Sequence, residues 1–304
     1  MNQQHVQGRI FDVERFSTKD GPGIRTVAFF KGCNLHCAWC HNPEGLAHQT
    51  ELGFDLSKCV HCHACASVCP TQAHTLLPGV HRFDRSLCKR CFACSRVCFS
   101  GALRQIGREV TAEALADKLA EDAPYFSASG GGVTLSGGEV LCQPEFAAQT
   151  LSLLKMRGIH TAVETNLCAP WEACDAVFKQ VDLVMADVKT LCAQTMRQYI
   201  GGNLTLLLQN LERLFSLELP LIIRTPVIPC VNDNEIAQIA HLLQSAAHLQ
   251  YYELLSYHPL GQSKARMLDK PDAVFDSPSR VQMESLAAAA RKCRIPVSIN
   301  GTPT

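Results

Sequence analysis

The sequence lacks a net charge, a long apolar run and a secretory leader. Its 28 lysine and arginine residues are balanced by 28 acidic residues, so it has no basic footprint of the kind that nucleic-acid-binding proteins carry. No apolar run approaches the length of a membrane span, and residues 1–16 have neither the basic region nor the apolar stretch of a secretory signal. These absences predict a cytoplasmic protein with no membrane and no nucleic-acid partner.

Cysteine, by contrast, is abundant. The chain of 304 residues has 17 cysteines, and those between residues 33 and 98 fall in three tight groups. A chain of this length buries a substantial core without the help of disulfide bonds. Clustered cysteines in a reducing compartment therefore indicate metal binding and not cystine.

Three segments of the chain differ in pattern. Residues 1–48 contain an apolar β-rich run that leads into the first cysteine group, residues 49–106 are cysteine-dense and loop-like, and residues 107–304 alternate amphipathic helical stretches with short β-rich runs. A helix is expected at 111–121 with Thr111 as its N-cap. The predicted strands are 24–30, 132–135, 160–164, 183–187, 221–228 and 252–256. Because a closed barrel needs eight such units, we expect an α/β fold: a partial (β/α)6 TIM-like barrel with a small inserted domain at 49–106.

The first cysteine group has three members, Cys33, Cys37 and Cys40, spaced C-x3-C-x2-C. Cysteine thiolates hold [4Fe-4S] clusters, and three thiolates serving four irons leave one iron open. Two alternatives stay open at this point. The group could form a zinc site completed by His36 or His41, although zinc sites usually pair two separated C-x2-C units, or a distant fourth cysteine could close the cluster.

With Trp39 before its last cysteine, this group resembles the motif of the radical S-adenosylmethionine superfamily. The resemblance implies that Cys33, Cys37 and Cys40 hold the catalytic cluster. It also implies that the open iron chelates the amino and carboxylate groups of S-adenosylmethionine. One electron from the reduced cluster then breaks the C5′–S bond and gives a 5′-deoxyadenosyl radical, and Trp39 packs near the adenine.

Polar motifs follow the predicted strands, where parallel α/β folds gather their chemistry. Gly137-Gly138-Glu139 resembles the superfamily's loop for the amino group of S-adenosylmethionine, and two glycines let a backbone approach a ligand closely. The next two strands end in Glu164-Thr165-Asn166 and Asp187-Val188-Lys189. Taken alone, each is an ordinary polar strand end.

Together these motifs resemble the glycyl-radical-activating branch of the superfamily. That resemblance implies a monovalent cation, Na⁺ or K⁺, bound by Glu164, Thr165, Met185 and Asp187. It also implies cofactor contacts from Asn166, Asp187, Lys189, Arg224 and His258, with Lys189 in the catalytic centre.

The N-terminal segment Asp20-Gly21-Pro22-Gly23-Ile24-Arg25 precedes the first predicted strand. Proline and glycine here favour a sharp turn. The segment also resembles the hallmark of glycyl-radical-enzyme activating enzymes. The implied function is abstraction of a glycine α-hydrogen from a partner glycyl radical enzyme, whose glycine loop Asp20 helps to receive. A flavodoxin or ferredoxin is the implied electron donor, and the partner's pathway is not written in the sequence.

The inserted segment repeats the spacing of a bacterial two-cluster ferredoxin, in which the fourth cysteine of each run binds the other cluster. One expected [4Fe-4S] cluster takes Cys59, Cys62, Cys65 and Cys98. The other takes Cys69, Cys88, Cys91 and Cys94. Phe99 stands where proline usually follows the second run. With the first cysteine group, this makes three [4Fe-4S] clusters, and we expect the two auxiliary ones to relay electrons.

Two other functions remain as alternatives: a radical enzyme acting on a small molecule or a peptide, and a non-enzymatic iron-sulfur electron carrier. Three positions depart from the resembled pattern. Val140 stands where proline is common, and Leu167 and Cys230 stand where glycine is common. These departures concern loop shape near the site and leave the expected cofactor unchanged.

Overall fold

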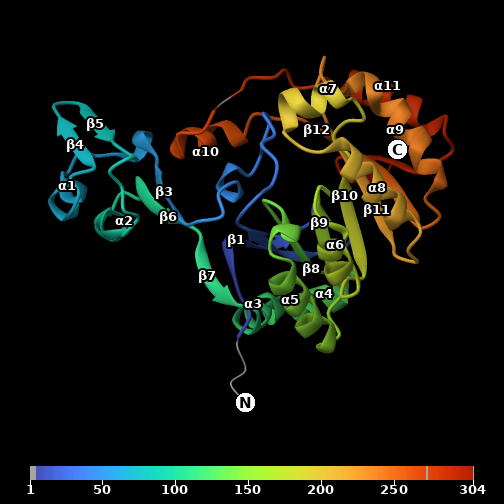
Figure 1. The fold of residues 1–304 in the computed structure, drawn as a ribbon, viewed down its shortest axis with the longest axis horizontal. Helices are drawn as coiled ribbons and strands as arrows, with labels where there is room; N and C mark the ends of the chain where they lie inside the picture. The colour runs from blue at the N-terminus through green and yellow to red at the C-terminus, as the bar shows by residue number, and fades with distance from the viewer. Residues whose placement is uncertain (1–4, 272, 304) are drawn as a thin grey trace.

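A computed structural model describes residues 5–271 and 273–303. A ten-stranded sheet, ordered β14-β13-β12-β11-β10-β9-β8-β2-β1-β7, lies at the centre (Figure 1). Its strands are β1 (Gln7–Ser17), β2 (Arg25–Phe30), β7 (Arg108–Thr111), β8 (Gly132–Gly137), β9 (Thr161–Thr165), β10 (Leu183–Asp187), β11 (Leu221–Val227), β12 (Leu249–Ser256), β13 (Val297–Ile299) and β14 (Thr302–Pro303). Because β7 and β14 are edges, the sheet stays open.

The six predicted strands correspond, in order, to β2 and β8 to β12, and every neighbouring pair among them is parallel. These strands are apolar and buried on both faces, as a parallel sheet covered by helices requires. Five of the six differ in their bounds from the prediction: β2 begins at Arg25, β8 continues to Gly137, β9 covers Thr161–Thr165, β11 ends at Val227 and β12 begins at Leu249. The parallel run also continues into β13, which was not predicted. The fold is therefore a mixed α/β fold with a parallel sheet.

Strand β1 was missed by the sequence reasoning. It pairs antiparallel with both β2 and β7, and its pairing with β2 has irregular register between Glu14 and Ser17. Charged residues and an exposed face dominate its second half, whose burial alternates only weakly. Such a strand near a sheet edge gives little apolar signal.

Helices cover the outer side of the sheet (Figure 1). The helices and short helical turns of this part are η1 (Pro43–Gly45), α3 (Ala112–Leu119), η3 (Ala120–Asp122), α4 (Ala123–Ser129), η4 (Val140–Cys142), α5 (Pro144–Met156), α6 (Trp171–Phe178), α7 (Ala193–Thr195), the π-helix η5 (Met196–Ile200), α8 (Leu204–Phe215), η6 (Asp233–Glu235), α9 (Ile236–Leu242), η7 (Leu243–Ser245), α10 (Gly261–Met267) and α11 (Arg280–Arg291). The expected helix at 111–121 is α3, whose N-cap Thr111 accepts a hydrogen bond from the backbone of Ala114 at 3.2 Å. None of the described helices is long and apolar enough to cross a membrane.

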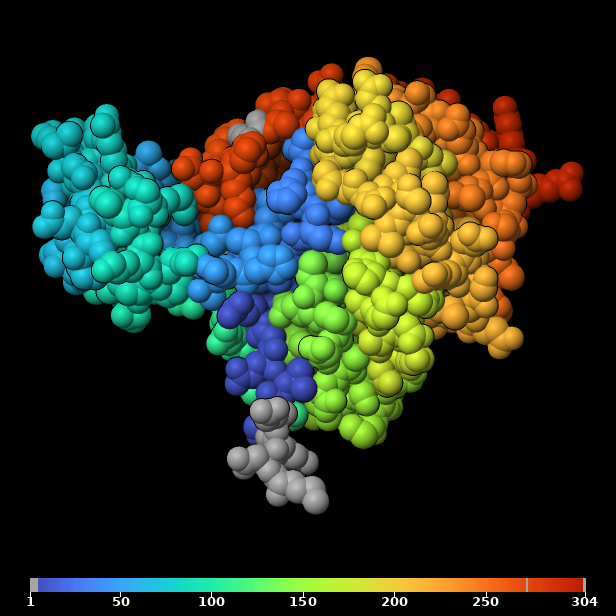
Figure 2. All heavy atoms as spheres, in the orientation of Figure 1, coloured from blue at the N-terminus to red at the C-terminus, as the bar shows by residue number. Residues whose placement is uncertain are grey.

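The cysteine-rich segment forms a lobe beside the sheet (Figures 1 and 2). It contains β3 (Glu51–Phe54), η2 (Leu56–Lys58), α1 (Ala64–Val68), β4 (His74–Leu77), β5 (Val80–Phe83), α2 (Ala93–Val97) and β6 (Leu103–Ile106). β3 pairs with β6 at the base of the lobe, and β4 and β5 form a hairpin. Arg85 donates to the carbonyls of Leu52 and Met267 at 2.8 and 2.7 Å, which ties the lobe to α10.

A buried lysine joins the lobe's base to the sheet. Lys31, directly after β2, donates to the carbonyl of Glu44 at 2.7 Å and to the carboxylate of Glu51 on β3 at 3.0 Å. Lys270 reaches the same carboxylate at 3.4 Å. Since a buried charge left without a partner is costly, this arrangement fixes the start of the lobe relative to the loop that follows β2.

Candidate active site

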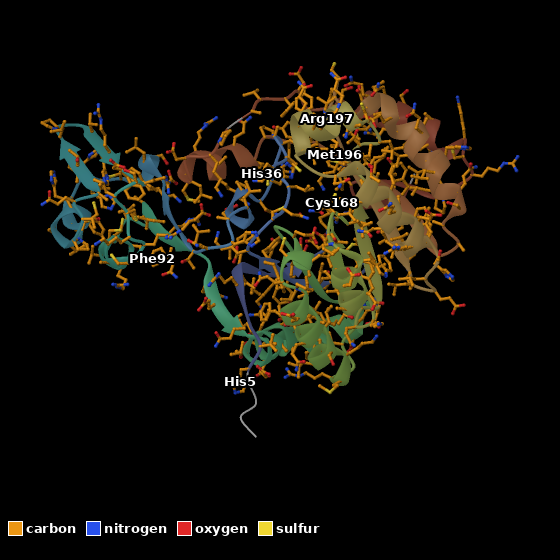
Figure 3. The ribbon with its side chains drawn as sticks, in the orientation of Figure 1. His5, His36, Phe92, Cys168, Met196 and Arg197 are labelled. Atoms are coloured by element: carbon orange, nitrogen blue, oxygen red, sulfur yellow. The ribbon has the colours of Figure 1, made fainter. Side chains whose placement is uncertain are left out.

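The loop with the first cysteine group is held by backbone hydrogen bonds. The amides of His36 and Ala38 donate to the carbonyls of Ile200 and Tyr199, each at 2.8 Å. Both acceptors belong to the π-helix η5, a rare element that occurs often at functional sites. Figure 3 labels His36 on this loop and Met196 in η5, and a Cβ on Gly201, directly after η5, would lie 3.7 Å from Nδ1 of His36. The loop is therefore fixed by the protein itself.

The three cysteines of this loop are half-buried and share one environment. Burial raises the pKa of Cys37 to about 12, although the nearby charge of Lys189 opposes the shift. Burial also raises the pKa of Cys33 and of Cys40, and the three thiols disfavour one another's ionisation. Thiolates are metal ligands, whereas thiols are not. Three half-buried cysteine sulfurs near one lysine fit a cluster whose iron supplies the positive charge that ionisation needs.

Trp39 presents an unpaired donor at the same place. It is 6% exposed, and its indole N–H has no hydrogen-bond partner among the residues that the structure describes. Its ring packs edge-on against Phe275, with centroids 5.8 Å apart, and lies 6.3 Å from the ring of Tyr199. Because a buried N–H without an acceptor is unfavourable, this donor fits a ligand with an acceptor edge.

The sequence reasoning missed Tyr199 and Phe275. The ring of Phe275 also packs edge-on against that of Tyr257, with centroids 5.9 Å apart. The aromatic surface therefore joins the cysteine loop, η5, the residue after β12 and the segment around Phe275. The signal for Phe275 was weak: it is the one aromatic residue in the polar, proline-containing segment 270–279. Nothing in the sequence around Tyr199 indicates a π-helix.

The glycine loop after β8 approaches the cysteine loop very closely. The amide of Glu139 donates to the carbonyl of Gly32 at 2.8 Å. A Cβ on Gly138 would lie 2.4 Å from the carbonyl oxygens of both Gly32 and Gly45. Glycine is therefore required at position 138 by backbone packing, and Gly137 adopts a φ of +115°, which also favours glycine.

Glu139 itself is turned into the protein. Its carboxylate accepts from the backbone of Leu141 at 2.9 Å, from the Thr165 hydroxyl at 2.8 Å and from the backbone of Asn166 at 2.7 Å. The side chain thus joins two of the predicted motifs to each other. Asn166 continues toward the cluster loop, because its amide nitrogen lies 2.9 Å from Oδ1 of Asn34 and 4.0 Å from Sγ of Cys33.

A buried network of four charges lies beyond these loops. Arg224 donates to Glu164 at 2.6 Å and to Asp187 at 3.3 Å, and Lys189 donates to Asp187 at 2.7 Å. Although burial opposes the charge on Asp187, Lys189 and Arg224 hold the pKa of its carboxyl below the ordinary value. The pKa of Lys189 is raised: burial opposes its charge, but Asp187 and the thiol of Cys37 outweigh burial.

The side chains of the four residues expected to bind a monovalent cation have other partners in the described part of the chain. Glu164 and Asp187 meet at the guanidinium of Arg224, and the Thr165 hydroxyl is engaged by Glu139. Met185 is buried with Ala162, Leu183 and Ile222 in a small apolar cluster. Arg224 therefore provides the positive charge between the two carboxylates.

The N-terminal signature folds back along the sheet. Fully buried Arg25 donates to the carbonyls of Pro22 and Val133, at 3.2 and 2.6 Å, and to the Thr134 hydroxyl at 2.7 Å. Thr134 in turn donates to the carbonyl of Asp20 at 2.7 Å. No specific role was predicted for Arg25, which holds this turn in place.

The Asp20 side chain accepts a hydrogen bond from Ser17. Burial and the neighbouring Glu164 raise the pKa of the Asp20 carboxyl to about 6. The signature aspartate therefore lies in the same electrostatic environment as the buried charge network.

His258 packs against His41, the residue that follows Cys40. Its ring stacks on that of His41 with centroids 3.9 Å apart, and Nε2 of His41 is 2.8 Å from the carbonyl of His258. Since His41 directly follows Cys40, the two histidines stand at the end of the cysteine loop.

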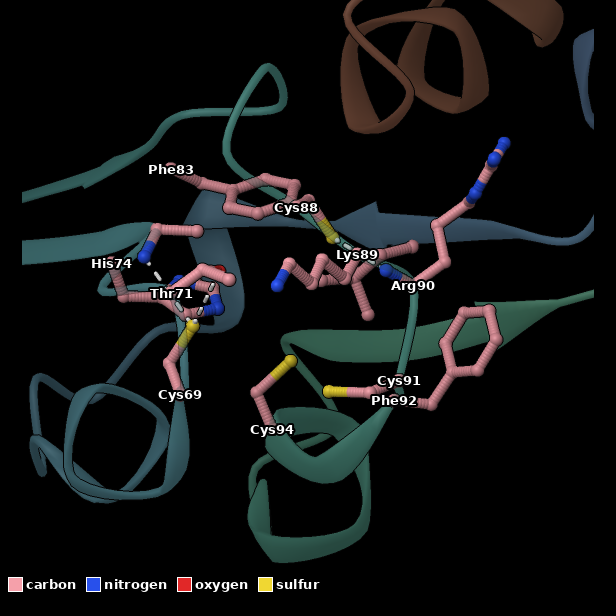
Figure 4. A pocket seen from close by; sticks show the side chains of 12 residues that line it. Cys69, Thr71, His74, Phe83, Cys88, Lys89, Arg90, Cys91, Phe92 and Cys94 are labelled. Carbon is pink, nitrogen blue, oxygen red and sulfur yellow. Dashed lines mark hydrogen bonds between the residues drawn. The ribbon is translucent and has the colours of Figure 1, made fainter.

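The lobe places its cysteines around two cavities. One is lined by Cys59, Cys62, Cys65 and Cys98, and the other, shown in Figure 4, by Cys69, Cys88, Cys91 and Cys94. Each cavity thus takes three cysteines from one run and the fourth from the other. All 17 cysteines are free thiols, so the residues present fit two cysteine-bound clusters.

Known proteins resemble this chain over most of its length. The Radical SAM superfamily model matches residues 27–243. The choline trimethylamine-lyase activating enzyme of Oleidesulfovibrio alaskensis is 38% identical over 95% of this chain and 97% of its own length. The (2S)-3-sulfopropanediol sulfolyase activating enzyme of Bilophila wadsworthia is 40% identical over 87% of this chain and 89% of its own. The pyruvate formate-lyase 2-activating enzyme of Escherichia coli is 34% identical over 96% and 92%.

Proposed function

This chain belongs to the radical S-adenosylmethionine superfamily and is a glycyl-radical-enzyme activating enzyme, and we propose how its residues divide the work. It cleaves S-adenosylmethionine and generates a glycyl radical on a partner enzyme. The observation that carries the assignment of the site is the group of three half-buried thiols close to Lys189, together with the unpaired indole of Trp39. No observation favours a small-molecule substrate or a purely electron-carrying role.

Cys33, Cys37 and Cys40 hold the catalytic [4Fe-4S] cluster in this proposal. When bound, the cluster supplies the electron that breaks the sulfonium bond of S-adenosylmethionine. Lys189, buried near Cys37, holds a positive charge beside the cofactor. Trp39 offers its N–H to the nucleoside.

The other predicted contacts surround the same cofactor. The backbone at Gly137 and Gly138 lines the amino end, and Asn166 and His258 flank the cysteine loop. Arg224 and Asp187 fix the position of Lys189. Glu139 acts through Thr165 and Asn166, whose positions it holds.

Asp20 lies where the partner's glycine loop is proposed to enter. The 5′-deoxyadenosyl radical takes the α-hydrogen of that glycine, so one C–H bond breaks and one forms. The products are 5′-deoxyadenosine, methionine and a partner with a glycyl radical. Arg25 keeps Asp20 in place through Thr134 and Pro22.

The lobe is proposed to be a ferredoxin-like insertion with two further [4Fe-4S] clusters. The grouping of its cysteines around two cavities supports this. Cys62 and Cys91, one in each group, are exposed, so a ferredoxin or flavodoxin can approach both centres. We propose that the two clusters relay electrons from such a donor to the cluster at Cys37.

Iron analysis of the anaerobically reconstituted protein tests this division. The wild-type chain is expected to hold about 12 irons, since three cubanes have four each. Replacing Cys33, Cys37 and Cys40 with alanine leaves about 8 irons and abolishes S-adenosylmethionine cleavage. A wild-type chain with only about four irons contradicts the two auxiliary clusters while leaving the catalytic one intact.

The partner is identified by activation. Lyases for choline, (2S)-3-sulfopropanediol and pyruvate are the first candidates, because activating enzymes for such lyases are 34–40% identical to this chain. The chain is incubated with reductant, S-adenosylmethionine and each candidate lyase in turn. One of the three mixtures should show a doublet radical signal by electron paramagnetic resonance. If no mixture shows the signal, the partner lies outside these three classes.

A monovalent cation at Glu164, Thr165, Met185 and Asp187 is a separate part of the proposal. It requires Glu164 and Asp187 to turn carboxylate oxygens from Arg224 toward the cation, whereas the Thr165 hydroxyl can donate to Glu139 and still offer a lone pair. Cleavage of S-adenosylmethionine that is the same in Na⁺, K⁺ and tetramethylammonium salts would exclude it.

A further inference from the structure

Two buried histidines lie between the cysteine cavities of the lobe. His74 on β4 and His81 on β5 are each 5% exposed. Nδ1 of His74 is 3.1 Å from Nε2 of His81, and Nδ1 of His81 is 3.2 Å from Sγ of Cys59. His81 lines the cavity of Cys59, whereas His74 lines the cavity of Cys88 (Figure 4). The pair therefore connects the walls of the two cavities.

With a thiolate at Cys59, the distances fit one arrangement of protons. A neutral imidazole has one N–H and one bare nitrogen, so each ring can donate one hydrogen bond and accept another. A thiolate at Cys59 accepts a hydrogen bond, and Nδ1 of His81 is the nearest ring nitrogen. Nε2 of His81 then accepts from Nδ1–H of His74.

Packing holds both rings in this orientation. The ring of His74 stacks on Phe83 with centroids 4.8 Å apart and an interplanar angle of 17°. The ring of His81 lies 4.4 Å from that of Phe54. Polar side chains in such apolar surroundings are unfavourable unless their hydrogen bonds are satisfied. Here Cys59 is the partner that completes the chain of hydrogen bonds.

We propose that His81 is a positioning residue that donates a hydrogen bond to the Cys59 thiolate, held in this tautomer by His74, and that the pair raises the reduction potential of one auxiliary cluster relative to the other. Hydrogen bonds to cysteine sulfur stabilise the more negative, reduced state of a cluster, and partners of ligating residues tune metal centres. This inference rests on the proposed presence of two clusters in the lobe. It adds an order to the relay, because the cluster at Cys59 becomes the easier one to reduce.

The same atoms allow one competing arrangement. Ligand atoms of Cys65, His74 and His81 all lie within 4.8 Å of one another, as a mononuclear metal site requires. Zinc binds such nitrogen and sulfur donors. Under the proposal Cys65 is instead a cluster ligand, so purified protein contains no zinc at this place.

A redox titration followed by electron paramagnetic resonance tests the inference. All proteins are the full chain with Cys33, Cys37 and Cys40 replaced by alanine, so that only auxiliary clusters give signals. His81→Phe removes the donor to Cys59. His81→Asn keeps an N–H near the position of Nδ1 but loses the contact with His74. His74→Phe leaves His81 in place without its partner, and His241→Gln, at an exposed site on α9, is the matched control.

We expect His81→Phe to lower the potential of one cluster by an amount equal to roughly a tenfold change in its reduction equilibrium, which is about 59 mV for a one-electron couple. The other cluster should change much less. In His81→Asn the reduction potential of that cluster should return most of the way to the value of the parent protein. The potential in His74→Phe should lie between those of His81→Phe and the parent protein, and the potential in His241→Gln should equal that of the parent protein.

Three results would overturn or redirect the inference. Unchanged potentials with full iron content in His81→Phe and His74→Phe would refute it. One zinc per chain that disappears in His74→Phe would assign the histidines to a metal site instead. A parent protein whose lobe holds no iron would refute the proposed clusters themselves, which is a separate failure. If His81→Phe loses iron, the reduction potentials of His74→Phe still test the inference, because His74 contacts His81 and not Cys59.

Discussion

Asp20 is predicted to destabilise the fold that it serves. Its carboxyl has its pKa raised from the ordinary 3.8 to about 6, first by burial and then by Glu164, while the hydrogen bond from Ser17 and the charge of Arg224 oppose the shift. The folded chain therefore keeps a proton on Asp20 at pH values where the unfolded chain has released it. Folding becomes less favourable as pH rises from about 4 to 6, and the penalty stays constant above that range.

The size of this penalty follows from the shift. One pKa unit corresponds to about 1.4 kcal/mol, so the full cost is about 3 kcal/mol above pH 7. At pH 5, where the proton is only partly released from the unfolded state, the cost is about 1.6 kcal/mol. Asp20→Asn removes the titration and should raise the free energy of unfolding by these amounts.

Urea unfolding at pH 5 and at pH 7.5, followed by circular dichroism under anaerobic conditions, measures the effect. The gain for Asp20→Asn should be about 1.4 kcal/mol larger at the higher pH. Asp12→Asn, at an exposed carboxylate on β1, is the control and should show no such pH dependence. In the proposed function, Asp20→Asn also keeps S-adenosylmethionine cleavage but loses most of the partner's radical signal.

Two results would refute this reasoning. An equal gain at both pH values would show that the carboxyl does not titrate as described. A more stable Asp20→Asn that activates its partner at the wild-type rate would separate the buried charge from function, and Asp20 would then be only a structural residue.

Three further substitutions test other parts of the site. Gly138→Ala places a Cβ 2.4 Å from two carbonyl oxygens. The free energy of unfolding in urea should therefore fall by about 3 kcal/mol, and the first cysteine group should bind less iron. An unchanged iron content would contradict the close packing of the two loops. Trp39→Phe removes the unpaired N–H. In calorimetric titration, S-adenosylmethionine should bind about fivefold more weakly, as expected for the loss of one hydrogen bond of about 1 kcal/mol. An unchanged affinity would place the cofactor away from the indole. Cys230 is exposed with a φ of +63°, so Cys230→Gly should stabilise the chain by up to about 1 kcal/mol in urea unfolding, whereas a loss of stability would contradict the strain.

The parallel strands could be predicted because their residues carry a strong local signal. The predicted strands 183–187 and 221–228 are rich in apolar residues, and they correspond to β10 and to β11, which ends at Val227. The grouping of the cysteines was implied by the resemblance of the two repeated runs to a two-cluster ferredoxin, in which the fourth cysteine of each run binds the other cluster. Strand β1 lacked such a signal, because its charged residues face solvent near a sheet edge.

Contacts between distant segments could not be predicted. The guanidinium of Arg224 lies between Glu164 and Asp187, and no property of the three local sequences favours that arrangement over a bound cation. His74 and His81 are in contact because the hairpin of β4 and β5 brings them together. The sequence around either histidine does not predict which residue it will contact.

Two departures from the resembled pattern acquire a physical meaning in the structure. Leu167 and Cys230, where glycine is common, have φ values of +57° and +63°. Non-glycine residues are strained in this region. The backbone shape is therefore kept although glycine is absent, and the buried Leu167 side chain offsets part of the strain by packing in the core.

The central claim is that three cysteines hold the catalytic cluster and leave one iron for S-adenosylmethionine. Electron-nuclear double resonance of the reduced enzyme, with the methionine nitrogen of S-adenosylmethionine labelled with ¹⁵N, tests it most directly. The account predicts a ¹⁵N coupling from that nitrogen on the cluster, and none after Cys37→Ala. A fully formed cluster that shows no ¹⁵N coupling, with a fourth protein ligand on its last iron, would contradict the account.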